Sequence, residues 1–280
     1  MTSLIAWVGV DSHGVSSLNF ASDSRITWYD KVKVIDRPWD FGKKLFWSSS
    51  TPDILGFAGD SCIASNILGQ FTDLLSIGAI PRTSSVPQYA SEVLASIINS
   101  SLRDFPDRFR GNFTVLHGLR IGTGKTAEWY VYRLYCDGWT CSSPEALDLP
   151  TNSGVLVEAG TGRANIVEYQ KVWKGSDIGG TSRAVYSAFC ESISLGTDER
   201  TGGAPQFCRL LRINPAKPVG IIWKGEKYVA GVRIPPSVTP QVLEWFNDQF
   251  EVCDPSTMQL SYKSQRQPRP GGLVYAKDGA

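Results

Sequence analysis

The order of the elements expected along the chain predicts an α+β fold, a four-layer α/β/β/α sandwich. Apolar runs with strand spacing come first and two amphipathic helical segments follow, then further strands, two more helices and a last group of strands. Elements grouped in this way bury their apolar faces as stacked layers. With 280 residues, 42% of them hydrophobic, the chain can build a sizeable core without metal or disulfide staples.

The first half of the chain predicts four strands and two helices. The strands are expected at residues 3–10, 17–28, 41–47 and 53–58, where apolar runs are bounded by turn residues. A helical pattern opens at Gly59 and is broken by Pro81, and a second helix is expected at about 87–104.

The second half predicts a strand hairpin, two helices and further strands. Residues 122–126 (GTGKT) look like part of a phosphate-binding loop, but Leu119 stands where the first glycine is needed and a strand follows, so we expect a hairpin turn. Strands are expected at 113–121, 127–136, 155–159, 206–213, 219–223 and 228–232, and helices at about 163–173 and 181–194.

No repeat or long linker divides the chain, so residues 1–232 are predicted to form one domain. Residues 233–280 are rich in proline and polar side chains and are predicted to be a C-terminal extension, partly extended or disordered. Within it, Trp245, Phe246 and Phe250 could pack on a neighbouring subunit or cap the core.

Charge and composition exclude several classes of function. A net charge of +1 gives no electrostatic basis for binding nucleic acid or an anionic membrane. No apolar run approaches the ~20 residues of a membrane span, and no signal peptide is recognisable, so a cytoplasmic location is expected. Six cysteines should then be reduced, although Cys136 and Cys141 could face each other across a hairpin. Two histidines leave little material for a metal centre or a histidine-based triad, so no metal or cofactor is expected.

Thr2 is the first candidate for catalysis. Its small side chain should allow an aminopeptidase to remove Met1, which would leave a hydroxyl beside a free α-amine. Such a threonine carries its own nucleophile and its own base, because the α-amino pKa lies near roughly 7.7–8.0. The sequence therefore permits an N-terminal nucleophile.

Five further segments, of which the last two form a pair, have residue types that suit such a site. They are residues 21–25 (ASDSR), 43–45 (KKL) and 56–60 (GFAGD), and the pair formed by 159–162 (AGTG) with 198–203 (DERTGG). Together with Thr2, and in this order, they resemble the proteasome β-subunit family, including the HslV-type bacterial peptidases. The resemblance covers roughly residues 2–230 and implies the sandwich of the N-terminal nucleophile hydrolases.

The resemblance implies that Asp23 supports a catalytic lysine and that Arg25 braces the site; a spacing of two places both on one side of a strand. The same periodicity lets only one of Lys43 and Lys44 face inward. Lys44 is preferred because the family has an apolar residue after its lysine, as Leu45 is here, and Lys43 remains the alternative.

Gly59 stands at a strand-to-helix junction, where its N–H could stabilise an oxyanion. The resemblance implies that Thr161 and Thr201 hydrogen-bond the terminal amine and that Asp198 helps to hold it. Residues 178–181 (IGGT) compete with 159–162 for the first of these segments. They leave only 18 residues before Asp198, too few for two helices.

The function expected from these observations is a threonine-type peptidase or amidohydrolase. The resemblance implies a peptide or protein substrate, a homo-oligomeric ring and a possible ATP-dependent unfoldase as partner. Two alternatives stay open: a non-catalytic proteasome-like ring or scaffold subunit, and a small-molecule amidase or acylase of the same superfamily.

Overall fold

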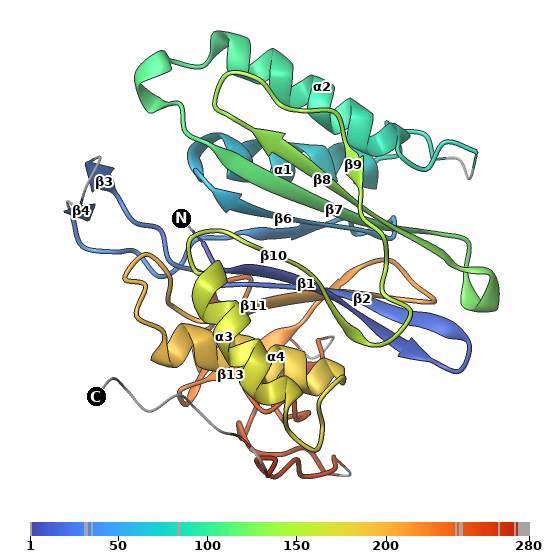
Figure 1. Ribbon diagram of the computed structural model, residues 1–280, viewed down its shortest axis with the longest axis vertical. Coiled ribbons are helices and arrows are strands. Elements are labelled where there is room, and N and C mark those ends of the chain that lie inside the picture. Colours follow the sequence, from blue (N-terminus) through green and yellow to red (C-terminus); the bar gives the residue numbers. More distant parts are fainter. Residues whose placement is uncertain are drawn as a thin grey trace.

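The computed structural model describes residues 2–30, 33–34, 36–82, 85–238, 240, 243–262, 264–271 and 273. Two five-stranded antiparallel sheets lie face to face in its centre (Figure 1). The first has the order β10-β1-β2-β11-β12 and comprises β1 (Leu4–Asp11), β2 (Gly14–Ser22), β10 (Gly154–Ala159), β11 (Gln206–Leu211) and β12 (Lys217–Pro218). The second has the order β5-β6-β7-β8-β9 and comprises β5 (Leu45–Trp47), β6 (Asp53–Gly59), β7 (Phe113–Ile121), β8 (Glu128–Cys136) and β9 (Glu145–Ala146).

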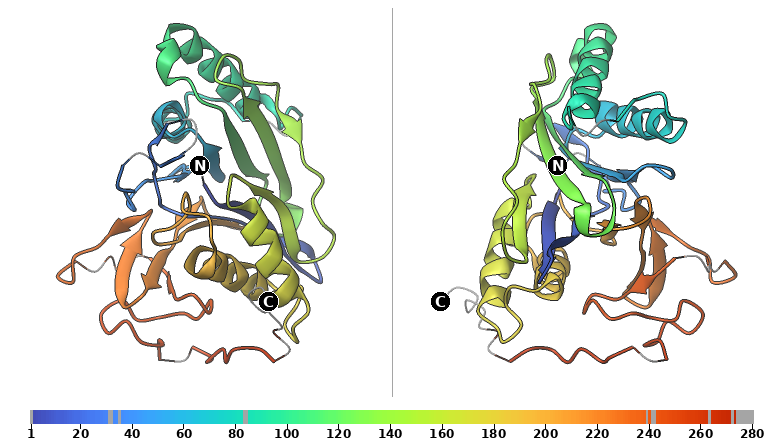
Figure 2. Two further views of the ribbon diagram at one scale, coloured as in Figure 1. Left: turned by 60° about the vertical axis from the view of Figure 1, so that its left-hand side comes forward. Right: turned by 90° about the vertical axis from the view of Figure 1, so that its right-hand side faces the viewer.

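Two pairs of helices cover the sheets. Helices α1 (Cys62–Ser76) and α2 (Tyr89–Asp104) pack on the second sheet, and α3 (Arg163–Lys174) and α4 (Ser182–Leu195) lie beside the first (Figures 1 and 2). Each helix turns an apolar stripe inward, as Leu68, Phe71 and Leu75 do on α1. Two short 3₁₀ turns, η1 (Asp107–Phe109) and η2 (Gly124–Thr126), flank β7, and η2 occupies the expected hairpin turn.

A third sheet lies below the first in Figure 1. It comprises β13 (Gly220–Trp223), β14 (Glu226–Val229), β15 (Val232–Arg233) and β16 (Trp245–Phe246), in the order β15-β14-β13-β16. A two-stranded ribbon, β3 (Tyr29–Asp30) with β4 (Lys33–Val34), completes the strands.

The predicted four-layer α/β/β/α sandwich is wrong as a description of this fold. The described residues are mostly sheet, with three sheets of four or five strands and only four α-helices. The sequence reasoning counted residues 219–223 and 228–232 among strands of two stacked sheets. They pair instead with each other and with β16, because residues 245–246 supply a parallel partner from far along the chain.

Two strands near the chain start are shorter than predicted. β2 ends at Ser22, so Asp23 and Arg25 lie beyond it, and β5 starts only at Leu45. The buried Gln206 side chain explains both ends. Its amide donates to the carbonyls of Asp23 (3.0 Å) and Gly42 (2.8 Å), which takes the place of a strand ladder.

The described part of the C-terminal extension packs on the body of the protein. Trp245 is buried, and Phe246 and Phe250 stack on each other with ring centroids 4.9 Å apart, against Phe207. Here these side chains cap a core, one of the two roles considered for them. Residues 239, 241, 242, 263, 272 and 274–280 of the extension lie outside the described residues.

The expectation of six reduced cysteines is wrong for one pair. Cys136 and Cys141 are joined by a disulfide across the end of β8, where an antiparallel bridge brings their Cα atoms to 4.0 Å. Within the described residues, no helix is long and apolar enough to cross a membrane.

Candidate functional site

The start of the chain lies in the middle of the first sheet, directly before β1. Because β1 is flanked by β10 and β2, residues from the ends of both neighbours meet Thr2 and Ser3. Ser3 donates its N–H to Asp23 Oδ1 (2.9 Å) and accepts from the Asp23 N–H (3.1 Å). Thr2 and Asp23 both have an exposed fraction of 0%.

Asp23 and Lys44 form an ion pair that is closed to solvent. The Lys44 ammonium donates to Asp23 Oδ1 at 2.7 Å, and both side chains are fully buried. The other carboxylate oxygen accepts the N–H groups of Arg25 (3.2 Å) and Gly202 (3.1 Å). Asp23 therefore receives four donors, which together fix the position of its carboxylate.

Burial lowers the pKa of Lys44 below its usual value, although the charge of Asp23 beside it acts in the opposite direction. A lysine in such a state can exchange a proton with a neighbouring group more readily than a solvated lysine. Lys43, the alternative, is exposed, and its ammonium lies 4.7 and 4.8 Å from the ring centroids of Phe46 and Trp47. Lys44 is thus the inward lysine.

The turn after β10 closes over the chain start. Gly162 donates its N–H to the Thr2 carbonyl at 3.2 Å. Gly160 has a φ of +94°, and a Cβ there would collide with that carbonyl, so the close approach requires glycine. Thr161, between them, is exposed. The competing segment 178–181 has another task, because Thr181 caps α4 by accepting the Ala184 N–H at 3.1 Å.

The loop after α4 places Thr201 against Asp198. Thr201 donates both its N–H (3.0 Å) and its hydroxyl (3.2 Å) to the Asp198 carbonyl. Burial raises the pKa of Asp198, but the hydrogen bonds from Arg200, together with the Thr161 side chain nearby, outweigh it and hold the pKa below its usual value. The Thr201 hydroxyl thus bonds Asp198 itself, whereas the resemblance implied that it bonds the terminal amine.

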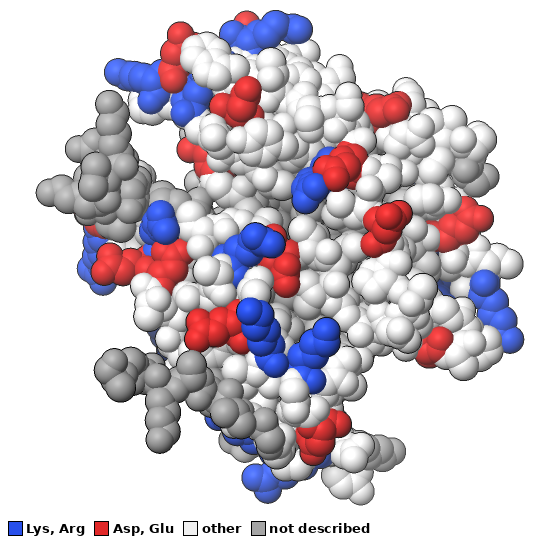
Figure 3. Space-filling model, in the orientation of Figure 1, with Lys and Arg blue, Asp and Glu red and all other residues white. Residues whose placement is uncertain are grey.

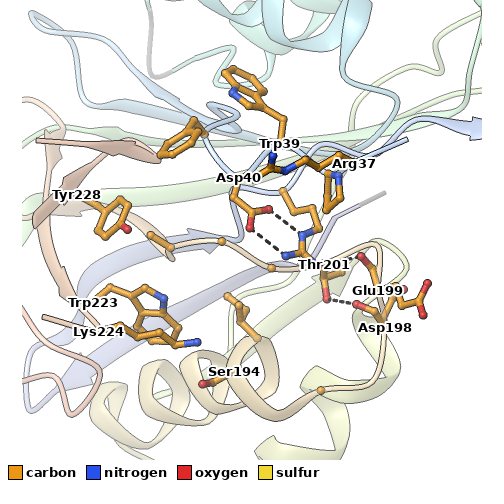
Figure 4. Close-up of a pocket in the computed structure, with 18 of the residues that line it drawn as sticks. Arg37, Trp39, Asp40, Ser194, Asp198, Glu199, Thr201, Trp223, Lys224 and Tyr228 are labelled. Atoms are coloured by element: carbon orange, nitrogen blue, oxygen red, sulfur yellow. Dashed lines mark hydrogen bonds and ion pairs between the residues drawn. The ribbon is translucent and has the colours of Figure 1, made fainter. Parts of the chain in front are cut away.

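Arg25 braces the site mainly through its backbone. Its N–H holds Asp23, while its guanidinium forms a two-point ion pair with Asp40 (2.8 and 2.9 Å) and donates to the Glu199 carbonyl (Figure 4). Sequence reasoning missed Asp40, a single acidic residue without a local pattern.

Gly59 ends β6 at the junction with the segment that leads into α1. Its φ is +118°, and a Cβ at this position would lie 2.7 Å from the Phe113 Cα, so only glycine fits here. The preceding residue, Ala58, lies beside Gly160, since a Cβ on Gly160 would be 3.3 Å from the Ala58 Cβ. Gly59 therefore lies near the turn that closes over Thr2.

A second buried polar network lies in the second sheet, away from the chain start. The Ser91 hydroxyl is 2.8 Å from His117 Nδ1, and His117 Nε2 is 3.0 Å from Asp53 Oδ1. Arg82 pairs with the other Asp53 oxygen. Two histidines were expected to be too few for a triad, yet His117 lies between a serine hydroxyl and an aspartate carboxylate, as the histidine of a Ser-His-Asp triad does. All three side chains are fully buried where α2 packs on the second sheet, so the network acts as a brace between the helix and the sheet.

The largest described cavity has a volume of about 1090 Å³ and adjoins the site (Figure 4). Arg25, Asp198, Thr201 and Gly202 form part of its wall. Thr2 does not line the cavity. Gly162, which bonds the Thr2 carbonyl, lies beside Thr201, since a Cβ on Gly162 would be 2.9 Å from Thr201 Cγ2. Because Thr201 also lines the cavity, it stands between the chain start and the cavity. Among the residues that the structure describes, no three acidic, histidine or cysteine side chains gather as a metal ion would require.

The charged surface around these elements is mixed. In the view of Figure 3, lysines, arginines and acidic residues alternate over the face drawn, without a large area of one sign. Comparison of the sequence with models of known protein families, and with curated proteins, finds no match. The geometry of the site is therefore the basis for a functional proposal.

Proposed function

We propose that this protein is a threonine-type hydrolase of peptide or other amide bonds, with Thr2 as an N-terminal nucleophile after removal of Met1. The resemblance to proteasome β subunits and HslV-type peptidases belongs to this proposal. The observation that carries it is the buried Lys44–Asp23 pair, because Asp23 Oδ1 also accepts the N–H of Ser3, the residue next to Thr2.

Three further contacts support the same proposal. The turn at 160–162 closes on the Thr2 carbonyl, and Thr201 lies beside Gly162. The five segments chosen for their residue types thus lie around the chain start, although they are spread over two hundred residues. A chance set of surface motifs would lie apart in the fold.

The reaction then follows from these groups. The Thr2 amine takes the proton of the Thr2 hydroxyl, and Oγ attacks the substrate carbonyl. The Lys44 ammonium favours the developing alkoxide, and the Gly59 N–H stabilises the oxyanion. The C–N bond breaks, the leaving amine takes the proton from the Thr2 amine, and a water molecule hydrolyses the acyl ester.

One observation favours the alternative of a non-catalytic scaffold subunit. Thr2 is fully buried, and a nucleophile has to be reached by its substrate. The catalytic proposal therefore requires that Thr2 is the first residue of the mature protein and that a substrate can reach it. A homo-oligomeric ring, an unfoldase partner and a cytoplasmic location belong to the same proposal.

The test uses the purified protein with its N-terminus identified. A panel of fluorogenic peptide amides should be hydrolysed by the native chain and by Thr2→Ser, which keeps the hydroxyl, but not by Thr2→Ala. Circular dichroism and urea unfolding show whether the variants remain folded. Equal hydrolysis by the native chain and a folded Thr2→Ala variant would refute the assignment of Thr2.

A further inference from the structure

The cavity beside the site is wide and is walled by three separate segments. Residues 25, 28 and 36–41 contribute to it, together with residues within 193–204 and 223–228, and its volume of about 1090 Å³ exceeds what one amino-acid side chain fills. Small-molecule pockets have volumes of roughly 300–1000 Å³. The cavity can therefore take several groups of a substrate at once.

Large aromatic side chains line this cavity and remain open to solvent. Trp28, Trp39 and Phe41 have exposed fractions of 47%, 49% and 40%. Trp39 and Phe41 lie edge to face, with ring centroids 6.2 Å apart. Trp223 and Tyr228 lie across the cavity from Trp39 (Figure 4). Exposed aromatic surface inside a concave wall indicates a ligand that covers it.

Four of the eight charged side chains in the wall form ion pairs within the protein. Arg25 pairs with Asp40, which also lines the cavity. Asp198 pairs with Arg200, and Glu226 pairs with Arg233. These charges have partners at 2.8–2.9 Å. The other four, Asp36, Arg37, Glu199 and Lys224, are two acidic and two basic side chains, so the wall offers little net field to a charged ligand. An uncharged, aromatic group fits such a wall best.

The cavity and the site share part of their framework. Gly202 and Arg25 both line the cavity, and both donate their backbone N–H groups to the Asp23 carboxylate. A substrate whose reacting carbonyl reaches Thr2 past Thr201 would place its neighbouring groups in the cavity. We propose that this cavity binds an uncharged, aromatic part of the amide substrate, with Trp39 as a main contact. This inference rests on the proposed function.

The test compares two amide substrates with the same leaving group, whose acyl parts differ only by a phenyl group in place of a methyl group. Trp39→Ala should lower kcat/KM for the phenyl substrate about tenfold and leave the methyl substrate within about twofold, because aromatic contact is lost only for the first. Trp139→Ala is the matched control, since Trp139 is 58% exposed and lies outside the cavity wall. It should change neither value.

Calorimetry with the Thr2→Ala variant separates binding from turnover. The phenyl substrate should bind this variant, and adding Trp39→Ala should weaken binding about tenfold. If turnover depends on Thr2 but Trp39→Ala does not reduce a preference for the phenyl substrate, the cavity proposal is overturned and the proposed function stands. Binding that depends on Trp39 without any turnover by the native chain overturns the proposed function and supports the cavity as a binding site. Absence of both overturns both.

Discussion

Replacing Lys44 by methionine removes one charge from the buried pair and keeps a side chain of similar length. The Lys44 ammonium lies 2.7 Å from Asp23 Oδ1 and both side chains are closed to solvent, so the substitution leaves a buried carboxylate without its counter-charge. Breaking a buried pair in this way costs about 3–5 kcal/mol of the free energy of unfolding. Asp23 keeps the N–H groups of Ser3, Arg25 and Gly202 as hydrogen-bond donors, which compensate for part of the loss. We therefore expect the low end, about 3 kcal/mol, or roughly a hundredfold in the folding equilibrium.

Urea unfolding monitored by tryptophan fluorescence measures this loss, because the chain has nine tryptophans. Lys43→Met is the matched control: Lys43 is exposed and its ammonium lies over the rings of Phe46 and Trp47, so its replacement should cost no more than about 1 kcal/mol. If Lys44→Met and Lys43→Met lower the free energy of unfolding equally, the reasoning about a desolvated pair is refuted.

Two further predictions concern the brace in the second sheet and the C-terminal extension. Burial raises the pKa of Asp53, but its hydrogen bond to His117 outweighs this and holds the pKa below the usual 3.8. A carboxylate with a lowered pKa gives stability that is present above pH 3.8 and is lost as the pH falls through the folded-state pKa. Asp53→Asn should therefore make the urea midpoint less sensitive to acidification below pH 3.8, and an unchanged pH slope would contradict this. Phe246→Ala should cost about 3–5 kcal/mol and lower Tm, because the ring is buried in an aromatic cluster. Tyr262→Ala, at 91% exposure, should change stability by less than about 0.5 kcal/mol, and equal effects of the two would show that the extension does not stabilise the fold.

Local patterns predicted most of the regular elements. The helices α2, α3 and α4 lie within about two residues of their expected bounds, because each has an apolar stripe at helical spacing and a glycine or proline near an end. Such features depend only on neighbouring residues, so a single sequence contains them. Helix α1 is shorter than expected, since it begins three residues after Gly59 and ends at Ser76, well before Pro81. Periodicity alone left Lys43 and Lys44 open as the inward lysine, and the preference for Lys44 came from the family resemblance.

Long-range partners account for what sequence reasoning missed. The third sheet depends on β16, which comes from the extension and pairs with β13 across more than twenty residues. Gln206 replaces strand pairing at Asp23 through one side chain, and Asp40 pairs with Arg25 from a separate loop. No periodicity marks single polar residues of this kind, and their roles become visible only when the chain is folded.

The central claim is that Thr2 becomes a reactive N-terminal residue. Intact-mass analysis and N-terminal sequencing, before and after treatment with an acylating β-lactone, test it directly. The account predicts loss of Met1, one added acyl group on residue 2, and no addition to the folded Thr2→Ala variant. Retention of Met1 in the native protein, or labelling of the native chain and of Thr2→Ala to the same extent, would contradict it.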